Sequence, residues 1–173
     1  SDHEAAIALR PSDAISRQQP ITTCMLALSE ALTGQTETST KTITAYLDSD
    51  QPLPFFDIQG RLYCIRALLA MDRITEAATQ LDRVFLAIES TDWRLIEIQS
   101  LALSLLFPRN RPMSSQKLES LQKLLSEMKA TGVRHLLCLT QSDFQFLLST
   151  AVEHDIERLF ATDLCYDILK ISW

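Results

Sequence analysis

Histidine and cysteine are the residues of this chain whose chemistry suits a metal ion. The three histidines are His3, His135 and His154, and none has another histidine close by in the sequence. Glu157 follows His154 by three residues, but one such pair is common on any solvated helix. The four cysteines are far apart and include no CxxC pair, which zinc sites usually need. We therefore predict no metal site, and we expect buried free thiols in a reducing compartment, with disulfides as the alternative.

Catalytic and phosphate-binding motifs are not found in the sequence. It contains no GxSxG, GxGxxG or P-loop motif, and its three glycines could hardly build a phosphate-binding loop. Because neither an activated nucleophile nor a phosphate cradle is evident, we expect no enzymatic activity and no cofactor in this segment. Binding is the function that remains, and a helical enzyme whose site has no recognisable motif is the alternative.

Polar and aromatic residues at helical spacing are the best candidates for a binding surface. Two sets lie on helix faces opposite the apolar stripes. Gln59, Tyr63 and Arg66 share a face of one helix, and Trp93 and Glu97, with Arg94 beside them, lie on the first helix of the following hairpin. Aromatic rings with one or two charged groups can orient a polar ligand or a peptide. We therefore predict these six residues as the ligand- or partner-binding site. The alternative is that the charged residues are simply solvated and that Trp93 is half-buried at a helix start.

The helices that carry these residues belong to a hairpin that occurs twice between residues 55 and 129. In the first copy, an apolar stripe lies on each side of the turn at Asp72-Arg73. Adding forty to their positions gives apolar residues again, so that Ile58, Leu62 and Ile65 correspond to Ile98, Ala102 and Leu105, and Ala78, Leu81, Phe85 and Ile88 correspond to Leu118, Leu121, Leu125 and Met128. Only Leu69 fails, since it corresponds to Arg109. A fixed offset of this size is typical of stacked helical repeats.

An earlier and more degenerate copy of the hairpin precedes these two. Gly34 suits the end of a helix, where a left-handed residue is favoured. Aligning Gly34 with Asp72 superposes Ile43 on Leu81, so that apolar positions of the two copies coincide. We therefore predict three successive hairpins.

Proline and glycine positions set the limits of the predicted elements. Pro11 and Pro20 mark residues 1–20 as a partly mobile N-terminal extension, which precedes a single helical-repeat domain over residues 21–173. Within that domain we predict helices over residues 21–32, 37–47, 55–71, 75–90, 93–106 and 115–129. After Gly132 we predict a helix or extended run over 133–139, a helix capped by Ser142-Asp143 that runs to 150, and short helices over 155–160 and 163–171. The predicted fold class is all-α: tetratricopeptide-like antiparallel helix hairpins, eight or nine helices in all, stacked in a right-handed superhelix.

The composition limits the partners and the location. The net charge of −6 argues against a grip on a nucleic-acid backbone, which needs clustered Lys and Arg. No apolar run reaches the roughly 20 residues of a membrane span, and the start, with Asp2 and Glu4, does not resemble a signal peptide. We expect a cytoplasmic protein that makes no membrane or nucleic-acid contact through this segment. Because the chain begins with Ser1, we also expect it to be a piece of a larger protein.

Two runs of sequence carry a family resemblance. The run LLAMDRITEA, from Leu68 to Ala77, resembles the turn and hydrophobic-x-Glu-Ala signature of tetratricopeptide-like hairpins. The run WRLIEIQSLAL, from Trp93 to Leu103, is similar to the repeat region of MalT-type regulators, which are bacterial transcription activators of the LuxR superfamily. The segment Gly132-Val133-Arg134, followed by a helical tail, fits the order of elements in that family. The resemblance covers roughly residues 55–169.

The resemblance implies a sensor domain of a transcription regulator. In that family a superhelical sensor lies between an ATP-binding switch module and a C-terminal helix-turn-helix domain, neither of which is in these 173 residues. The sensor's role is to bind a small-molecule effector or a regulatory protein. An effector in the concave groove, which the first helices of the hairpins would line, is expected to favour the active conformation. The alternative is a generic tetratricopeptide-like scaffold for protein–protein interaction.

Overall fold

The computed structural model describes residues 11–47, 55–107 and 113–169, and these ranges contain helices but no strand. In chain order the elements are α1 (Pro11–Leu32), α2 (Thr36–Leu47), α3 (Phe55–Ala70), α4 (Ile74–Ile88), α5 (Arg94–Leu105), α6 (Ser115–Thr131), α7 (Gln141–Glu153), α8 (Arg158–Leu164) and a π-helical turn η1 (Cys165–Leu169). The predicted all-α class and number of helices are confirmed. The six helices predicted between residues 21 and 129 all exist, and from α2 to α6 the ends agree within about two residues.

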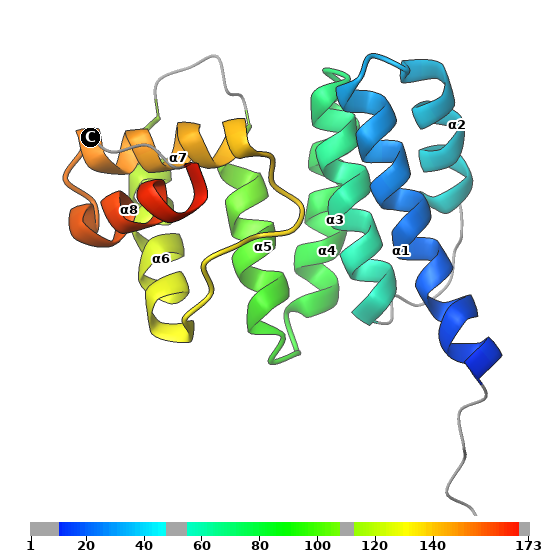
Figure 1. Cartoon of the computed structure of the whole chain (residues 1–173), viewed down its shortest axis with the longest axis horizontal. Coiled ribbons are helices and arrows are strands. Elements are labelled where there is room, and N and C mark those ends of the chain that lie inside the picture. The colour runs from blue at the N-terminus through cyan, green and yellow to red at the C-terminus, as the bar shows by residue number, and fades with distance from the viewer. Residues whose placement is uncertain (1–10, 48–54, 108–112, 170–173) are drawn as a thin grey trace, which may run out of the picture.

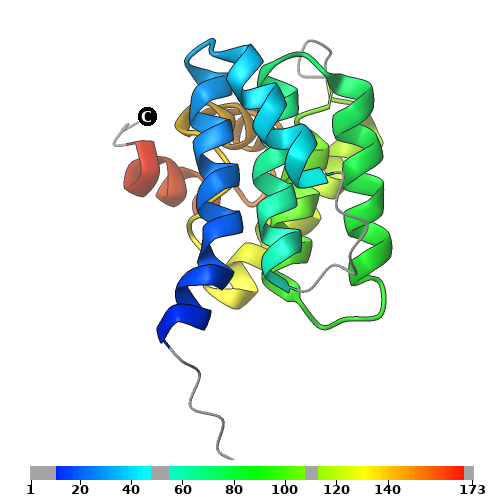
Figure 2. The same ribbon diagram turned by 90° about the vertical axis from the view of Figure 1, so that its right-hand side faces the viewer.

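Successive helices pair as hairpins. Helices α1 and α2, α3 and α4, and α5 and α6 pack against each other, while α3 also packs between α1 and α5. Figure 1 shows α1 to α6 running roughly parallel or antiparallel, with α7 crossing them. In the perpendicular view, α4 and the C-terminal helices lie on opposite sides of the layer that contains α1 and α3 (Figure 2). Helix α4 therefore covers one side of this layer, and the C-terminal helices cover the other (Figure 2).

The first two hairpins turn in the same way. Gly34 has a φ of 83° and Asp72 has a φ of 59°, so both residues adopt the left-handed conformation that ends many helices. The alignment of Gly34 with Asp72 is thus confirmed at the level of the backbone. Gly132, with a φ of 71°, ends α6 in the same conformation, and Ser114 caps its start by accepting a hydrogen bond from the Lys117 N–H.

Small residues bring α1 and α3 close together. Cys24 and Ala27 on α1, and Cys64 and Ala67 on α3, are all fully buried. Between them lies Gly60, where an added Cβ would be 3.3 Å from the Cys24 sulfur and 2.8 Å from the ring carbon Cζ of Tyr46. Because Gly60 has no side chain, the Tyr46 ring of α2 can lie against α3. The Tyr46 hydroxyl then donates a hydrogen bond to the backbone carbonyl of Asp57.

Both ends of the chain differ from the sequence-based prediction. Helix α1 begins at Pro11 and contains Pro20, so the predicted boundary at residue 20 is not a helix end, while residues 1–10 lie outside the described ranges. A proline is tolerated in the first helical turn. One in the interior removes a backbone hydrogen bond, and α1, which packs on α2 and α3, nevertheless continues through Pro20. In the C-terminal part, residues 133–139 form no regular element, and α8 is followed directly by η1. The N-cap of α7 is Thr140, just before the predicted Ser142-Asp143, and Asp143 completes the cap as the N3 residue of a capping box.

Candidate ligand groove

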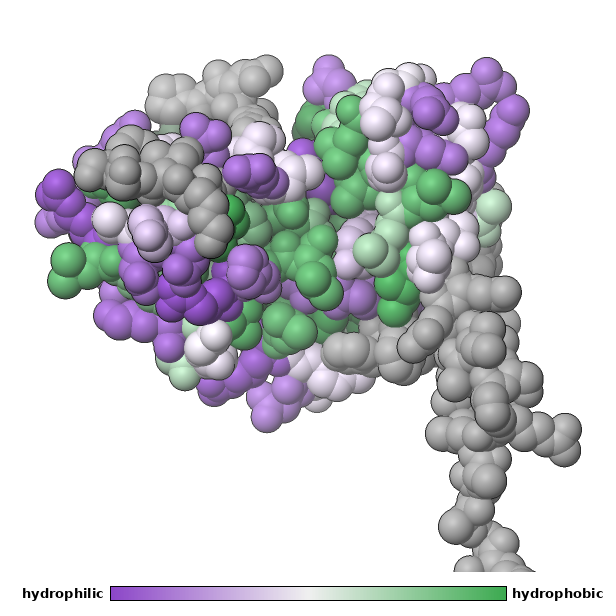
Figure 3. Space-filling view, viewed as in Figure 1, coloured by the Kyte–Doolittle hydropathy of each residue, from purple (hydrophilic) through white to green (hydrophobic). Residues whose placement is uncertain are grey.

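The predicted binding face of α3 is covered by the C-terminal part of the chain. Gln59, Tyr63 and Arg66 have only 8%, 3% and 6% of their surface exposed. The prediction that they face an open groove is therefore wrong. Residues 133–140 run from α6 across this side of the helix layer before α7 begins (Figure 1), and apolar surface remains over the middle of the same face (Figure 3).

Arg66 is held by a carboxylate of α7. Its Nε donates a hydrogen bond to Asp143 Oδ2 at 2.7 Å, and its Nη2 donates to Oδ1 at 3.0 Å. The two side chains are 7% and 1% exposed, so this is a buried, bidentate ion pair of the kind that arginine forms best. The same carboxylate accepts hydrogen bonds from the Thr140 N–H and hydroxyl. Arg66 thus anchors the start of α7 on α3, which is a structural role.

Gln59 and Tyr63 also have partners inside the protein. Gln59 exchanges side-chain hydrogen bonds with Gln99 of α5. Burial raises the pKa of Tyr63 above its usual value, and the nearby thiol of Cys138 adds to the rise. Burial also raises the pKa of Cys138, to about 12. The Tyr63 hydroxyl and the Cys138 thiol are therefore neutral at physiological pH. Both belong to the packed contact between α3 and the segment that leads into α7.

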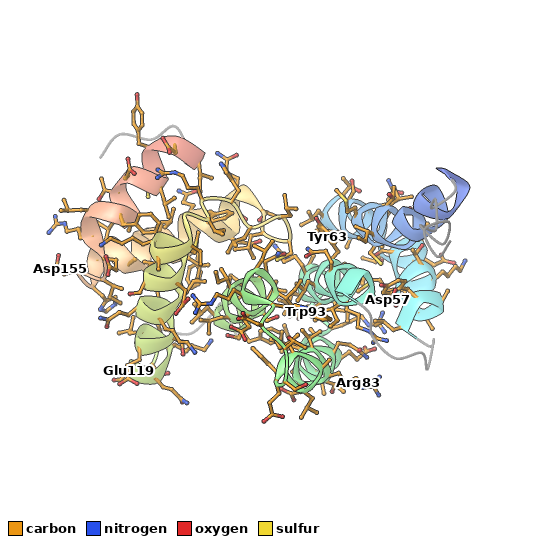
Figure 4. The ribbon with its side chains drawn as sticks, turned by 90° about the horizontal axis from the view of Figure 1, so that it is seen from below. Asp57, Tyr63, Arg83, Trp93, Glu119 and Asp155 are labelled. Atoms are coloured by element: carbon orange, nitrogen blue, oxygen red, sulfur yellow. The ribbon has the colours of Figure 1, made fainter. Side chains whose placement is uncertain are left out.

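A groove of about 730 Å³ lies on the other side of the helix layer, between α4, α5 and α6. In the view from below, α3, α4 and α5 are seen end-on, with α4 and α6 on either side of α5 (Figure 4). Tyr63 is on the opposite side of this layer from Arg83 of α4 (Figure 4). The apolar part of the groove consists of Phe85, Leu86, Ile88, Ile98 and Leu101. Two of these side chains are unusually open to solvent, since Phe85 is 37% and Leu86 is 71% exposed.

Charged residues surround this apolar floor. The groove is also lined by four carboxylates and two cations: Asp82, Glu89, Glu97 and Glu127, and Arg94 and Lys123. Arg94 makes one contact within the groove, at 3.8 Å from Glu127, and its side chain is 63% exposed. A long ion pair of this kind in water stabilises little. The rim is therefore negative on balance and its side chains are available to a ligand.

Two of the six predicted site residues, Arg94 and Glu97, line this groove. Trp93 is half-buried and packs against the core at the N-cap position of α5. The residues predicted on α3 and those predicted on α5 are not at equivalent positions of the repeat. The offset of forty relates Gln59 to Gln99 and Tyr63 to Leu103, and these two residues of α5 are buried as well. The residues that α4 and α6 contribute to the groove were not among the six predicted from the sequence. The one local signal was Leu86, an apolar residue next to the buried stripe of an amphipathic helix.

Metal sites, disulfides and membrane spans are the other features that the described ranges could contain. No group of three or more His, Cys, Asp or Glu side chains there is arranged to bind a metal ion. Cys24, Cys64, Cys138 and Cys165 are all buried thiols that form no disulfide, as predicted. No helix in the described ranges has both the length and the apolar character to cross a bilayer.

Comparison with known proteins adds no family assignment. Neither a family model, nor a curated protein, nor a solved structure matches the chain.

Proposed function

We propose that this chain is a non-catalytic sensor domain that binds its effector in the groove between α4, α5 and α6. The observation that carries the proposal is the groove itself: a hollow of about 730 Å³ with an apolar floor and a charged rim. Ligand sites typically have volumes of roughly 300–1,000 Å³ and combine apolar walls with a few polar groups. Clustered exposed apolar side chains, such as Phe85 and Leu86, are a common mark of a binding surface.

A regulatory role is supported by the way α5 is connected to the rest of the protein. Helix α5 supplies Arg94, Glu97, Ile98 and Leu101 to the groove and also binds α3 through Gln99. Helix α3 in turn binds α7 through Arg66. A ligand that favours one position of α5 thereby biases the placement of α3 and α7, which is a population shift. We propose the MalT-type regulators as the context of this domain, with DNA binding in another part of the protein.

A generic protein–protein interaction scaffold is the second candidate function. It is favoured by the 71% exposure of Leu86, because a small ligand usually has most of its surface buried by its site, and an open floor suits a larger partner. Both candidates use the same groove.

A thermal-shift screen with point variants tests the proposal. Any compound of a small-molecule library, sugars and aromatic acids included, that raises the melting temperature saturably should lose this effect in the Leu86→Glu and Arg94→Ala variants. Leu137→Glu is the matched control, since Leu137 is 69% exposed and does not line the groove. A rise that survives both groove variants would place the binding site elsewhere and contradict the proposal.

A further inference from the structure

The groove combines an open apolar floor with a rim that has more negative than positive charges. We propose that its occupant is a basic amphipathic helix of a partner protein, an inference that rests on the groove being the binding site proposed above. Apolar side chains of the partner would cover Phe85 and Leu86, and its Lys or Arg side chains would meet the carboxylates of the rim. This is the helix-in-groove mode of recognition.

The charges of the rim favour a cationic partner. In the described part of the chain, Asp82, Glu89 and Glu97 are exposed, and none of them takes part in an ion pair. Glu127 has only the long contact with Arg94. An acidic partner would bring further negative charge to this rim, whereas a basic one finds carboxylates on three different helices. Complementary charges of this kind set specificity and speed association.

The spacing of the carboxylates favours a helix. Asp82 on α4 and Glu89, the C-cap residue of α4, are seven residues apart, which corresponds to about two turns and roughly 10 Å. A partner helix that lies along α4 can present basic residues at the same interval. Its apolar residues at the positions between them would then face Phe85 and Leu86, which lie between the two carboxylates in sequence.

The exposure of the floor favours an occupant larger than a metabolite. Leu86 keeps 71% of its surface open, so a ligand deep in the groove would leave most of this side chain in water. A helix lying across α4 covers it. Burying apolar surface of this kind supplies the main driving force of such complexes.

A designed peptide tests the proposal on the intact chain. The probe is a short fluorescein-labelled helix with leucines on one face and lysines elsewhere, followed by fluorescence anisotropy. One comparison peptide has the same composition in scrambled order, and another has glutamates in place of the lysines. We expect saturable binding of the leucine–lysine helix alone. Leu86→Glu and Glu97→Lys should each weaken it about tenfold or more, while Leu137→Glu and Glu119→Lys, which change exposed residues outside the lining, should not.

The outcomes separate this inference from the proposed function. Equal binding of the scrambled or the glutamate peptide, or equal effects of Glu97→Lys and Glu119→Lys, would overturn the basic-helix proposal. Nile red, an uncharged apolar dye, provides the second readout. If the dye binds and Leu86→Glu removes its signal while the leucine–lysine helix does not bind, the groove is a ligand site and the helix proposal is wrong. If Leu86→Glu affects neither probe, both proposals fail.

Discussion

Gln59 and Gln99 are forty residues apart and exchange two side-chain hydrogen bonds across the contact between α3 and α5. Gln59 Nε2 donates to Gln99 Oε1 at 2.9 Å, and Gln99 Nε2 donates to Gln59 Oε1 at 3.3 Å. The two residues are 8% and 1% exposed, so the amides satisfy each other away from water. Residues at equivalent positions of two repeats are thus hydrogen-bonded to each other. The pair joins α5, which lines the groove, to α3, which holds α7 through Arg66.

Replacing one glutamine of this pair should lower the free energy of unfolding more than replacing both. Gln59→Leu leaves a buried amide at Gln99 without its partner, and we expect the free energy of unfolding to fall by about 1–3 kcal/mol. The double variant Gln59→Leu/Gln99→Leu replaces both amides by apolar groups and should recover much of that loss. Urea denaturation of the three proteins measures this coupling. Additive losses would show that the two side chains stabilise the fold independently.

The ion pair of Arg66 with Asp143 makes a similar but stronger prediction. Because both groups are buried, Arg66→Ala leaves a carboxylate uncompensated and should destabilise the protein by about 3–5 kcal/mol. An exposed Arg66, as predicted from the sequence, would have made this variant nearly silent. Arg66→Met/Asp143→Leu removes both charges and should lose less than the sum of the single variants. Denaturant titration is the measurement, and near-wild-type stability of Arg66→Ala would contradict the buried pair.

Gly60 should not tolerate even a methyl group. Alanine is the better helix former by about 1 kcal/mol, but its Cβ would be 2.8 Å from Tyr46 Cζ and closer still to the hydroxyl. Overpacking of this kind typically destabilises by about 1–3 kcal/mol, so we expect Gly60→Ala to lower the melting temperature. In a Tyr46→Ala background the same substitution should be neutral or stabilising. A loss of equal size in both backgrounds would contradict the contact.

Shortening a buried leucine to alanine at equivalent positions of the two hairpins should destabilise the protein by similar amounts. Leu81 and Leu121, forty residues apart, are 4% and 0% exposed, so Leu81→Ala and Leu121→Ala should each lower the free energy of unfolding by about 2–5 kcal/mol. Leu86→Ala, in the same helix as Leu81 but facing the groove, should stay within about 0.5 kcal/mol of wild type. Chemical denaturation separates the three variants. Equal effects at all three positions would show that the assignment of core and groove faces is wrong.

Cys138 should make stability depend on alkaline pH. Its pKa is raised by burial to about 12, against about 8.5 for an exposed thiol. Above pH 8.5 the unfolded state loses a proton that the folded state keeps, so stability is full below that pH and falls as the pH rises toward 12. The slope for this thiol approaches 1.4 kcal/mol per pH unit. Comparing the wild type with Cys138→Ala between pH 7 and 10 isolates the effect, and parallel pH profiles would contradict it.

The fold was largely predictable because its signals are local. Apolar residues at helical spacing mark the helices of the three hairpins, and Gly34 and Asp72 mark equivalent turns. The run from Pro11 to Pro20 was misread because its two prolines are strong local signals against a helix. Only the packing of α1 on its neighbours, which no local pattern reveals, counters them.

The site was only partly predictable because it depends on distant parts of the chain. The sequence around Arg66 contains no signal for its partner Asp143, which is 77 residues away. The local pattern of α3 is the same whether a polar face is solvated or is covered by a later segment. Arg94 and Glu97 were identified because they are polar residues on an amphipathic helix. Lys123 and Glu127 were missed because they join the groove only through the placement of α6 beside α5.

The position of the binding site can be measured directly by methyl NMR. Titrating the isotopically labelled protein with Nile red, and separately with the leucine–lysine helix, reports which Ile and Leu methyl groups sense the ligand. We expect shifts that cluster at Leu86, Ile98 and Leu101 in the groove, with little change at Leu136 and at Leu147 of α7. Shifts that cluster on the α7 side and spare the groove would contradict this expectation.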